Sequence, residues 1–198
     1  FSGLAFDAVK ASYASDLFTV DAWWSQLANF SSPTSIISFG ESLEDSIDFY
    51  GVYGTYAGIE DTAIDAYFLL VHDDSPFLGG DDSLSLYTVG ARLAGAWDSP
   101  LGLLDYNVEG AYQFGDTGLV TYIDDGDYSA WAFNALVGYT FDQIELAPKL
   151  ELEYAYFSGD DDLTDDDKES FVRLFSDVHY GELNLGGNLD GAMTNMHI

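Results

Sequence analysis

Cysteine is absent from this chain of 198 residues, which excludes disulfide bonds, thiolate nucleophiles and cysteine-ligated zinc sites. Basic residues are scarce, since five lysines and arginines stand against 35 aspartates and glutamates and give a formal net charge of −30. A basic stripe that could neutralise phosphates is therefore missing, and nucleic acid is excluded as a partner. The sequence also has no run of 18 apolar residues, which excludes a transmembrane helix.

The chain is nevertheless rich in hydrophobic and aromatic residues, at 47% and 16% of its length, so it is not a disordered acidic tail. Its apolar residues recur at every second position, as in LDYNVEGAYQF, residues 104–114. This period of two predicts a β-strand with a different environment on each face. In a soluble sandwich the apolar face would point to a core, whereas in an outer-membrane barrel it would point to lipid.

Eight segments follow this alternation, and a ninth begins near Thr194. Their lengths suit a tilted transmembrane strand of about 9–11 residues, whereas strands of soluble proteins usually have about five or six. The predicted strands are Leu4–Tyr13, Leu17–Leu27, Asp48–Tyr56, Thr62–His72, Leu86–Trp97, Leu104–Phe114, Tyr128–Phe141 and Pro148–Phe157.

Short and long connections alternate between these segments. ASD, AGIED, DSPLGL and DQIELA are the short ones, and a long connection follows every second segment. Outer-membrane barrels have this order because tight periplasmic turns alternate with longer extracellular loops. We therefore predict an all-β fold, an antiparallel up-and-down transmembrane β-barrel of which residues 1–198 form one segment with eight or nine strands. Counting from the short turns places the first strand's start at the extracellular end, whereas bacterial barrels have periplasmic termini, so we expect an incomplete barrel.

The two faces of the predicted strands differ in chemistry. The predicted lipid-facing residues are Val9, Ala11, Tyr13, Phe18, Val20, Ala22, Trp24, Ile64, Ala66, Phe68, Leu70, Val89, Ala91, Leu93, Tyr106, Val108, Gly110, Tyr112, Trp131, Phe133, Ala135, Val137, Tyr139, Leu150, Leu152, Tyr154 and Tyr156. The predicted lumen-lining residues are Lys10, Asp21, Asp65, Arg92, Asp105, Asn107, Glu109, Gln113, Asn134, Lys149, Glu151 and Glu153. The segment Asp48–Tyr56 has rings on both faces, and its alternation does not orient it.

Several stretches are similar to the alginate-export outer-membrane β-barrels. They are FDAVKASY (6–13), DFYGVYGTY (48–56), IDAYFL (64–69), YTVGARLAG (87–95), VEGAYQFG (108–115), LELEYAYFSGDDD (150–162) and, less closely, FVRLFSDVHYGELN (171–184). The resemblance implies a pore of about 18 strands in the outer membrane of a Gram-negative bacterium, of which this chain would supply roughly half.

The charge of the predicted lumen favours cations. A lumen lined mostly by Asp and Glu would repel a polyanion such as alginate and concentrate cations. We expect a passive porin-like channel for solutes or polymer, with outer-membrane lipid and the remainder of the barrel as its partners. One alternative is a structural sheath that holds a basic periplasmic or lumenal partner, such as a plug protein or a cytochrome. Another is a soluble acidic β-protein from a halophile.

The acidic segment SGDDDLTDDDKES, residues 158–170, is a candidate Ca²⁺ site, because Ca²⁺ takes six to eight oxygen ligands. Its spacing does not match an EF-hand, and a solvated surface loop is the alternative. The candidate ligands are Asp160, Asp161, Asp162, Asp165 and Asp166. We expect no other cofactor.

Catalytic motifs are not evident in the sequence. Glu151 and Glu153 lie on one strand face about 7 Å apart, a separation that a glycosidase could use. In a barrel, however, such carboxylates usually line water. His72, His179 and His197 are scattered and form no metalloprotease or triad motif. We therefore expect that the protein is not an enzyme.

The short link DSPLGL predicts a hairpin with a specific register. If Val89, Ala91 and Leu93 share a face with the even-numbered residues of the next strand, paired residue numbers sum to 201. Arg92 then lies directly opposite Glu109, close enough for an ion pair. In a wet lumen that pair would contribute only about 0–1 kcal/mol.

Overall fold

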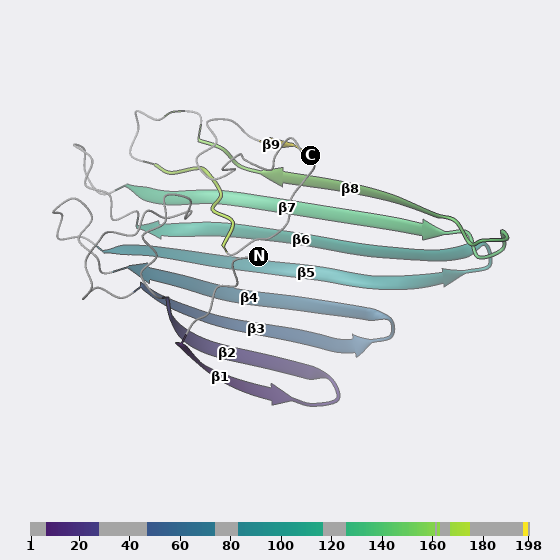
Figure 1. Cartoon of the computed structure of the whole chain (residues 1–198), viewed down its shortest axis with the longest axis horizontal. Coiled ribbons are helices and arrows are strands. Elements are labelled where there is room, and N and C mark those ends of the chain that lie inside the picture. Colours follow the sequence, from purple (N-terminus) through teal and green to yellow (C-terminus); the bar gives the residue numbers. More distant parts are fainter. Residues whose placement is uncertain are drawn as a thin grey trace.

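The computed structural model describes residues 7–27, 47–73, 83–116, 126–160, 162, 167–174 and 196–197. These residues form one antiparallel sheet in which each strand pairs with the next in the chain (Figure 1). The strands are β1 (Asp7–Ala14), β2 (Phe18–Leu27), β3 (Ile47–Ile59), β4 (Thr62–Asp73), β5 (Leu84–Ser99), β6 (Gly102–Asp116), β7 (Asp127–Thr140), β8 (Lys149–Phe157) and β9 (Met196–His197). The predicted all-β, up-and-down fold is confirmed.

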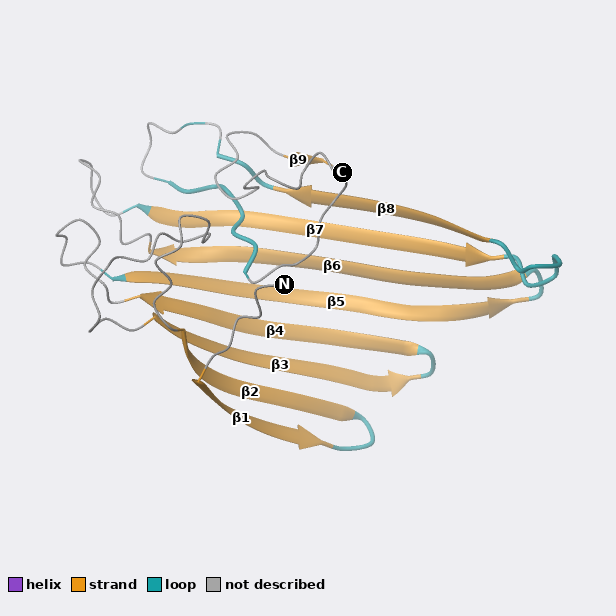
Figure 2. Cartoon of the chain, viewed as in Figure 1, coloured by secondary structure: helices purple, strands orange, loops and turns teal. Residues whose placement is uncertain are grey.

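The short connections all lie at one end of the sheet, here called the short-turn end, as Figure 2 shows. The strand ends that the long connections join lie at the opposite end, here called the long-loop end. The predicted strand positions are correct, although β5 and β6 extend beyond the predicted bounds at both ends. No helix in the described part of the chain is long and apolar enough to cross a membrane.

Two of the tight turns depend on unusual backbone angles. The link between β3 and β4 is two residues long, and Asp61 adopts a φ of 53°, a left-handed conformation that Asp tolerates well. After the β5–β6 turn, Gly102 has a φ of 151°, and a Cβ there would overlap the carbonyl oxygen of Thr140. A glycine is required at this position because both its angle and its space exclude a side chain.

The register of the β5–β6 hairpin is the predicted one. Leu93 pairs with Val108, Ala91 pairs with Gly110, and residue numbers sum to 201 throughout the ladder. The ladder from β2 to β4 also orients β3, because Trp24 pairs with Tyr50, which pairs with Leu70. The even-numbered residues of β3 therefore share the face of the predicted lipid-facing residues.

The sheet does not close on itself. In the described residues β1 pairs only with β2, and β8 pairs with β7 and the short β9. The fold therefore matches a segment of a barrel wall, with one face that would point outward and one that would point inward.

Candidate functional site

One face of the sheet is apolar and exposed, and we call it the apolar face. Every exposed large hydrophobic residue within β1–β8 lies on it, apart from Ile59 beyond the irregular register of β3. Val9 and Leu152, for example, have 67% and 75% of their surface exposed. Tyr156 was also predicted to face lipid, but it is buried, and its ring packs 4.2 Å from that of Trp131.

The opposite face, here called the polar face, carries the charged and amide side chains of the middle of the sheet. At the long-loop end the apolar face also carries polar residues, which are Asp7, Gln26, Asp48, Asp116 and Asp127. The ladder registers place all twelve predicted lumen-lining residues on this one face. Six of them are carboxylates, three are basic and three are amides. The polar face therefore has an excess of negative charge even after each basic residue is paired.

Arg92 is the basic residue at the middle of the polar face. It donates to Asp65 at 2.7 Å and to Asn107 at 2.8 Å. Glu109 lies directly opposite Arg92 as predicted, but the expected ion pair is not formed, because Glu109 accepts a 2.7 Å hydrogen bond from the Tyr67 hydroxyl. Asp65 is only 2% exposed, so a charge-assisted bond is what makes its burial tolerable.

Lysines hold the carboxylates nearer the edges of the sheet. Lys10 pairs with Asp21 at 2.9 Å. Lys149 reaches across β7 to Asp105 at 2.9 Å and also pairs with Glu151 at 2.7 Å.

Gly138 makes the reach of Lys149 possible, because a Cβ there would lie 2.5 Å from the lysine Cε and 2.6 Å from an oxygen of Asp105. Next along this side of the sheet, Asn134 donates to Glu153 at 2.8 Å. The polar face is thus crossed by bonds that run perpendicular to the strands.

Three aromatic rings on the polar face were not predicted. A Cβ at Gly51 would overlap the ring of Trp23, and a Cβ at Gly90 would overlap the ring of Tyr67, so each ring lies over a glycine of the next strand. Tyr53 stacks beside Tyr67 with ring centroids 5.8 Å apart and planes 3° apart. The signal in the sequence was a glycine placed opposite an aromatic residue on the neighbouring strand.

Residues 167–174, here called the inner strap, cross the polar face near the long-loop end (Figures 1 and 2). On β7 the Ser129 amide donates to the Lys168 carbonyl at 3.0 Å. On β8 the Ser158 hydroxyl donates to the Glu169 carbonyl at 2.6 Å. Farther along the strap, Val172 packs in a buried cluster with residues of three other strands, Ile47, Val71 and Leu86. The strap is therefore bonded to β7 and to the residue that follows β8, and it packs in a cluster with residues of β3, β4 and β5.

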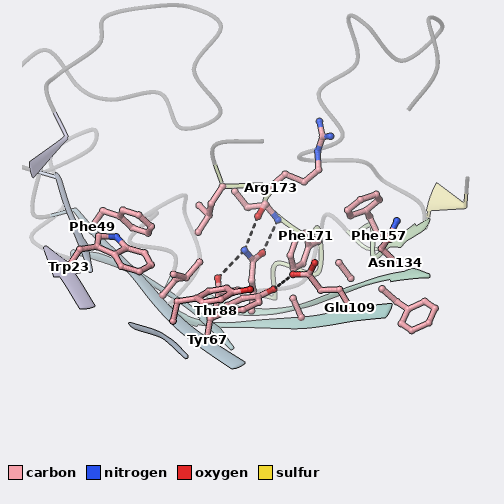
Figure 3. A pocket seen from close by; sticks show the side chains of 17 residues that line it. Trp23, Phe49, Tyr67, Thr88, Glu109, Asn134, Phe157, Phe171 and Arg173 are labelled. Atoms are coloured by element: carbon pink, nitrogen blue, oxygen red, sulfur yellow. Dashed lines mark hydrogen bonds between the residues drawn. The ribbon is translucent and has the colours of Figure 1, made fainter. Parts of the chain in front are cut away.

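Gln113 joins the inner strap to the middle of the sheet. Its carbonyl oxygen accepts from the Val172 amide and its amide donates to the Val172 carbonyl, both at 2.8 Å. The same amide donates to Thr88 at 3.2 Å, and Gln113 has no exposed surface. Figure 3 shows these bonds, with Thr88 and Tyr67 on the sheet side and Phe171 and Arg173 on the strap side.

A cavity of about 440 Å³ lies between the strap and the sheet. Its sheet wall includes Trp23, Tyr67 and Glu109, and its strap wall includes Phe171 and Arg173. The Arg173 guanidinium lies 5.9 Å from the centre of the Phe157 ring, within the range of a cation–π contact. The cavity therefore combines apolar walls with charged groups of both signs.

The candidate Ca²⁺ ligands are only partly described. Asp161, Asp165 and Asp166 lie outside the described residues. Asp160 is buried and lies 3.9 Å from the Lys168 ammonium, and Asp162 is exposed. Among the described residues, no group of three or more acidic or histidine side chains is arranged to hold a metal ion. Ca²⁺ binding in this segment stays a prediction.

Comparison with known proteins gives one family. A family model described as alginate export matches residues 2–198. No curated protein and no solved structure matches the chain.

Proposed function

The chain belongs to the alginate export family, and from this membership we propose that it forms part of the wall of an outer-membrane channel with a water-filled, cation-favouring lumen. The family supports transport through a membrane β-barrel in the outer membrane. The open sheet supplies the matching architecture, with strands long enough to cross the hydrocarbon layer. We place the channel in a Gram-negative bacterium, with lipid and the remainder of the barrel as its partners.

The separation of the two faces is the observation that carries this proposal. Exposed hydrophobic side chains cover the apolar face of eight successive strands, which in water would be an aggregation-prone surface. Contact with lipid would keep this surface out of water, and the wall of a membrane barrel has the same arrangement, apolar outside and polar inside. The same observation speaks against the soluble halophilic protein.

Aromatic rings on the apolar face support the membrane orientation. At the short-turn end Phe18 packs on Tyr56 with ring centroids 4.9 Å apart. At the long-loop end Tyr87 packs on Phe114 at 5.3 Å. Two such rows resemble the aromatic girdles that lie at the two membrane interfaces of outer-membrane barrels.

The polar face supports a preference for cations. Among the twelve predicted lumen-lining residues, six carboxylates outnumber three basic residues, and each of these basic residues already pairs with a carboxylate. Fixed negative charge inside a narrow aqueous path concentrates cations and repels polyanions. We therefore propose small cationic or neutral solutes as the permeant class in place of alginate.

Reversal-potential measurement across a KCl gradient tests this proposal. The complete channel that contains this chain, in a planar bilayer, should prefer K⁺ over Cl⁻, and the preference should fade as the Debye length falls from about 30 Å at 0.01 M to about 10 Å at 0.1 M salt. Anion preference would contradict the acidic lumen. Absence of conductance would favour the alternative of a sheath filled by a basic partner.

A further inference from the structure

We propose that the inner strap is the size-selecting constriction of the channel and that Gln113 is the positioning residue that holds it there. The inference rests on the proposed function, because the polar face surrounds a lumen only when the barrel wall closes. It adds that the strap selects permeating solutes by size, whereas the charged side chains of the polar face select them by charge.

The path of the strap places it across the lumen. Lys168 of the strap bonds to main-chain groups of β7, and the Phe171 amide donates to the carbonyl of Ser158 at 3.1 Å. Val172 belongs to the buried cluster that also contains Ile47 of β3. All these contacts are on the polar face, so the strap does not lie over the barrel mouth alone. A segment that bonds to β6 and β7 on the inside of the wall, and packs in a cluster with residues of β3, β4 and β5, must occupy part of the lumen cross-section.

Gln113 fixes the strap at the centre of this span. Its side chain binds both main-chain groups of Val172, as a neighbouring strand would do. Because Gln113 is fully buried, breaking the contact would leave its side-chain carbonyl oxygen and the two main-chain groups of Val172 without partners. The strap is therefore held in place and does not swing freely.

The strap and the ion pair of Arg92 with Asp65 lie at different positions along the lumen. Gln113, which bonds to the strap, also donates to Thr88 of β5, and Arg92 lies four residues farther along that strand, about 13 Å toward the short-turn end. The strap itself contributes the buried apolar residues Phe171 and Val172 and the guanidinium of Arg173. At the height of Arg92 the wall carries Asp65 and Glu109, and Glu109 also lines the cavity between the strap and the sheet.

The substitution Q113E tests the anchor with little change in shape. The carboxylate still accepts from the Val172 amide, but it cannot donate to the Val172 carbonyl, so the strap loses its hold at pH 7. We expect conductance to rise about two-fold and larger neutral polyethylene glycols to enter the lumen, because the aperture widens. Near pH 3, below the ordinary Glu pKa of about 4.3, the protonated acid donates again and the polymer cut-off should return to the wild-type value.

The matched control is N134D, which adds the same charge to the same face. Asn134 lines the same cavity, but its amide donates to Glu153 and does not hold the strap, so this variant should shift ion selectivity without moving the polymer cut-off. A wild-type cut-off in Q113E at both pH values would overturn the inference. The cut-off is read with neutral polymers, so this outcome is independent of whether the lumen prefers cations.

A single-cysteine variant tests the strap's location without disturbing Gln113. The chain has no cysteine, so R173C introduces one thiol, and a bulky water-soluble methanethiosulfonate reagent should then block most of the current. The same reagent on S12C, on the polar face of β1 and away from the strap, should block much less. Equal block at the two positions, or no block at R173C, would overturn the constriction.

Discussion

Leu93 and Arg92 are neighbours in the chain but belong to two different surfaces. On the apolar face Leu93 lies beside Ile64 and Val108 and is 41% exposed. Its side chain is apolar and needs no specific partner. On the polar face Arg92 lies beside Asp65 and is held by directed, charge-assisted bonds. The comparison shows that a position on the apolar face requires only an apolar side chain. A position on the polar face requires a specific side chain that can bond to its neighbours.

A charge introduced on the apolar face should lower the stability of the protein in lipid more than the loss of a polar contact or the filling of a glycine. L93R places a guanidinium near the middle of β5 where lipid is expected, at a cost of about 2–4 kcal/mol. A94R, one residue along on the polar face, should cost much less because water and carboxylates surround it. Unfolding in lipid vesicles by denaturant titration measures both variants. Equal destabilisation of the two would contradict the assignment of the faces.

Breaking a polar contact should have the next largest effect. R92M keeps the length of the side chain but leaves the buried Asp65 without its cation, at a cost of about 1–3 kcal/mol. In the double variant R92M/D65N the charge is removed as well, so part of the stability should return. The same vesicle titration measures the recovery, and a double variant no more stable than R92M would show that burial of Asp65 is not the cause.

Filling a glycine on the polar face should have a smaller effect. In G90A the new methyl group displaces the Tyr67 ring, which can swing into the lumen, so the loss is mainly the hydrogen bond to Glu109, about 1 kcal/mol. G110A adds a methyl group on the apolar face where no atom lies closer than 4.0 Å, and it should be nearly neutral. Tyrosine fluorescence and vesicle stability would detect the difference. A neutral G90A would contradict the packing of Tyr67 over Gly90.

Removing one lysine should change selectivity more than stability. K149M frees Asp105 and Glu151 near the short-turn end, and both carboxylates are partly open to solvent. The cation preference should therefore increase in reversal-potential measurements at low salt. If K149M reduced the preference for cations, the charges of Asp105 and Glu151 would not act on the permeating ions.

Local pattern was enough to predict the strands, the faces and one register. Link length and parity together fixed the β5–β6 pairing, because a shift by one residue would have reversed the faces. The partners of individual side chains were less predictable. Asp65 and Glu109 flank Arg92 on opposite sides, and the choice depends on Tyr67, which already binds Glu109.

The inner strap could not be predicted from local pattern. Parity placed Gln113 on the polar face, but its partner Val172 lies 59 residues away in a segment whose sequence gives no sign of folding inward. Trp23 over Gly51 is a similar case, because alternation does not say in which direction a ring leans. Contacts of this kind depend on how the sheet curves and on what fills its concave side.

The most direct test of the account is a comparison of single-cysteine labels at positions 93 and 94. In this cysteine-free chain, L93C and A94C each carry one environment-sensitive fluorophore in a reconstituted channel. We predict that brominated lipid quenches the label at 93 and that acrylamide, a neutral aqueous quencher that an acidic lumen does not repel, quenches the label at 94. Quenching of both labels by the same agent, or in the reverse order, would contradict the claim that the apolar face meets lipid and the polar face lines water.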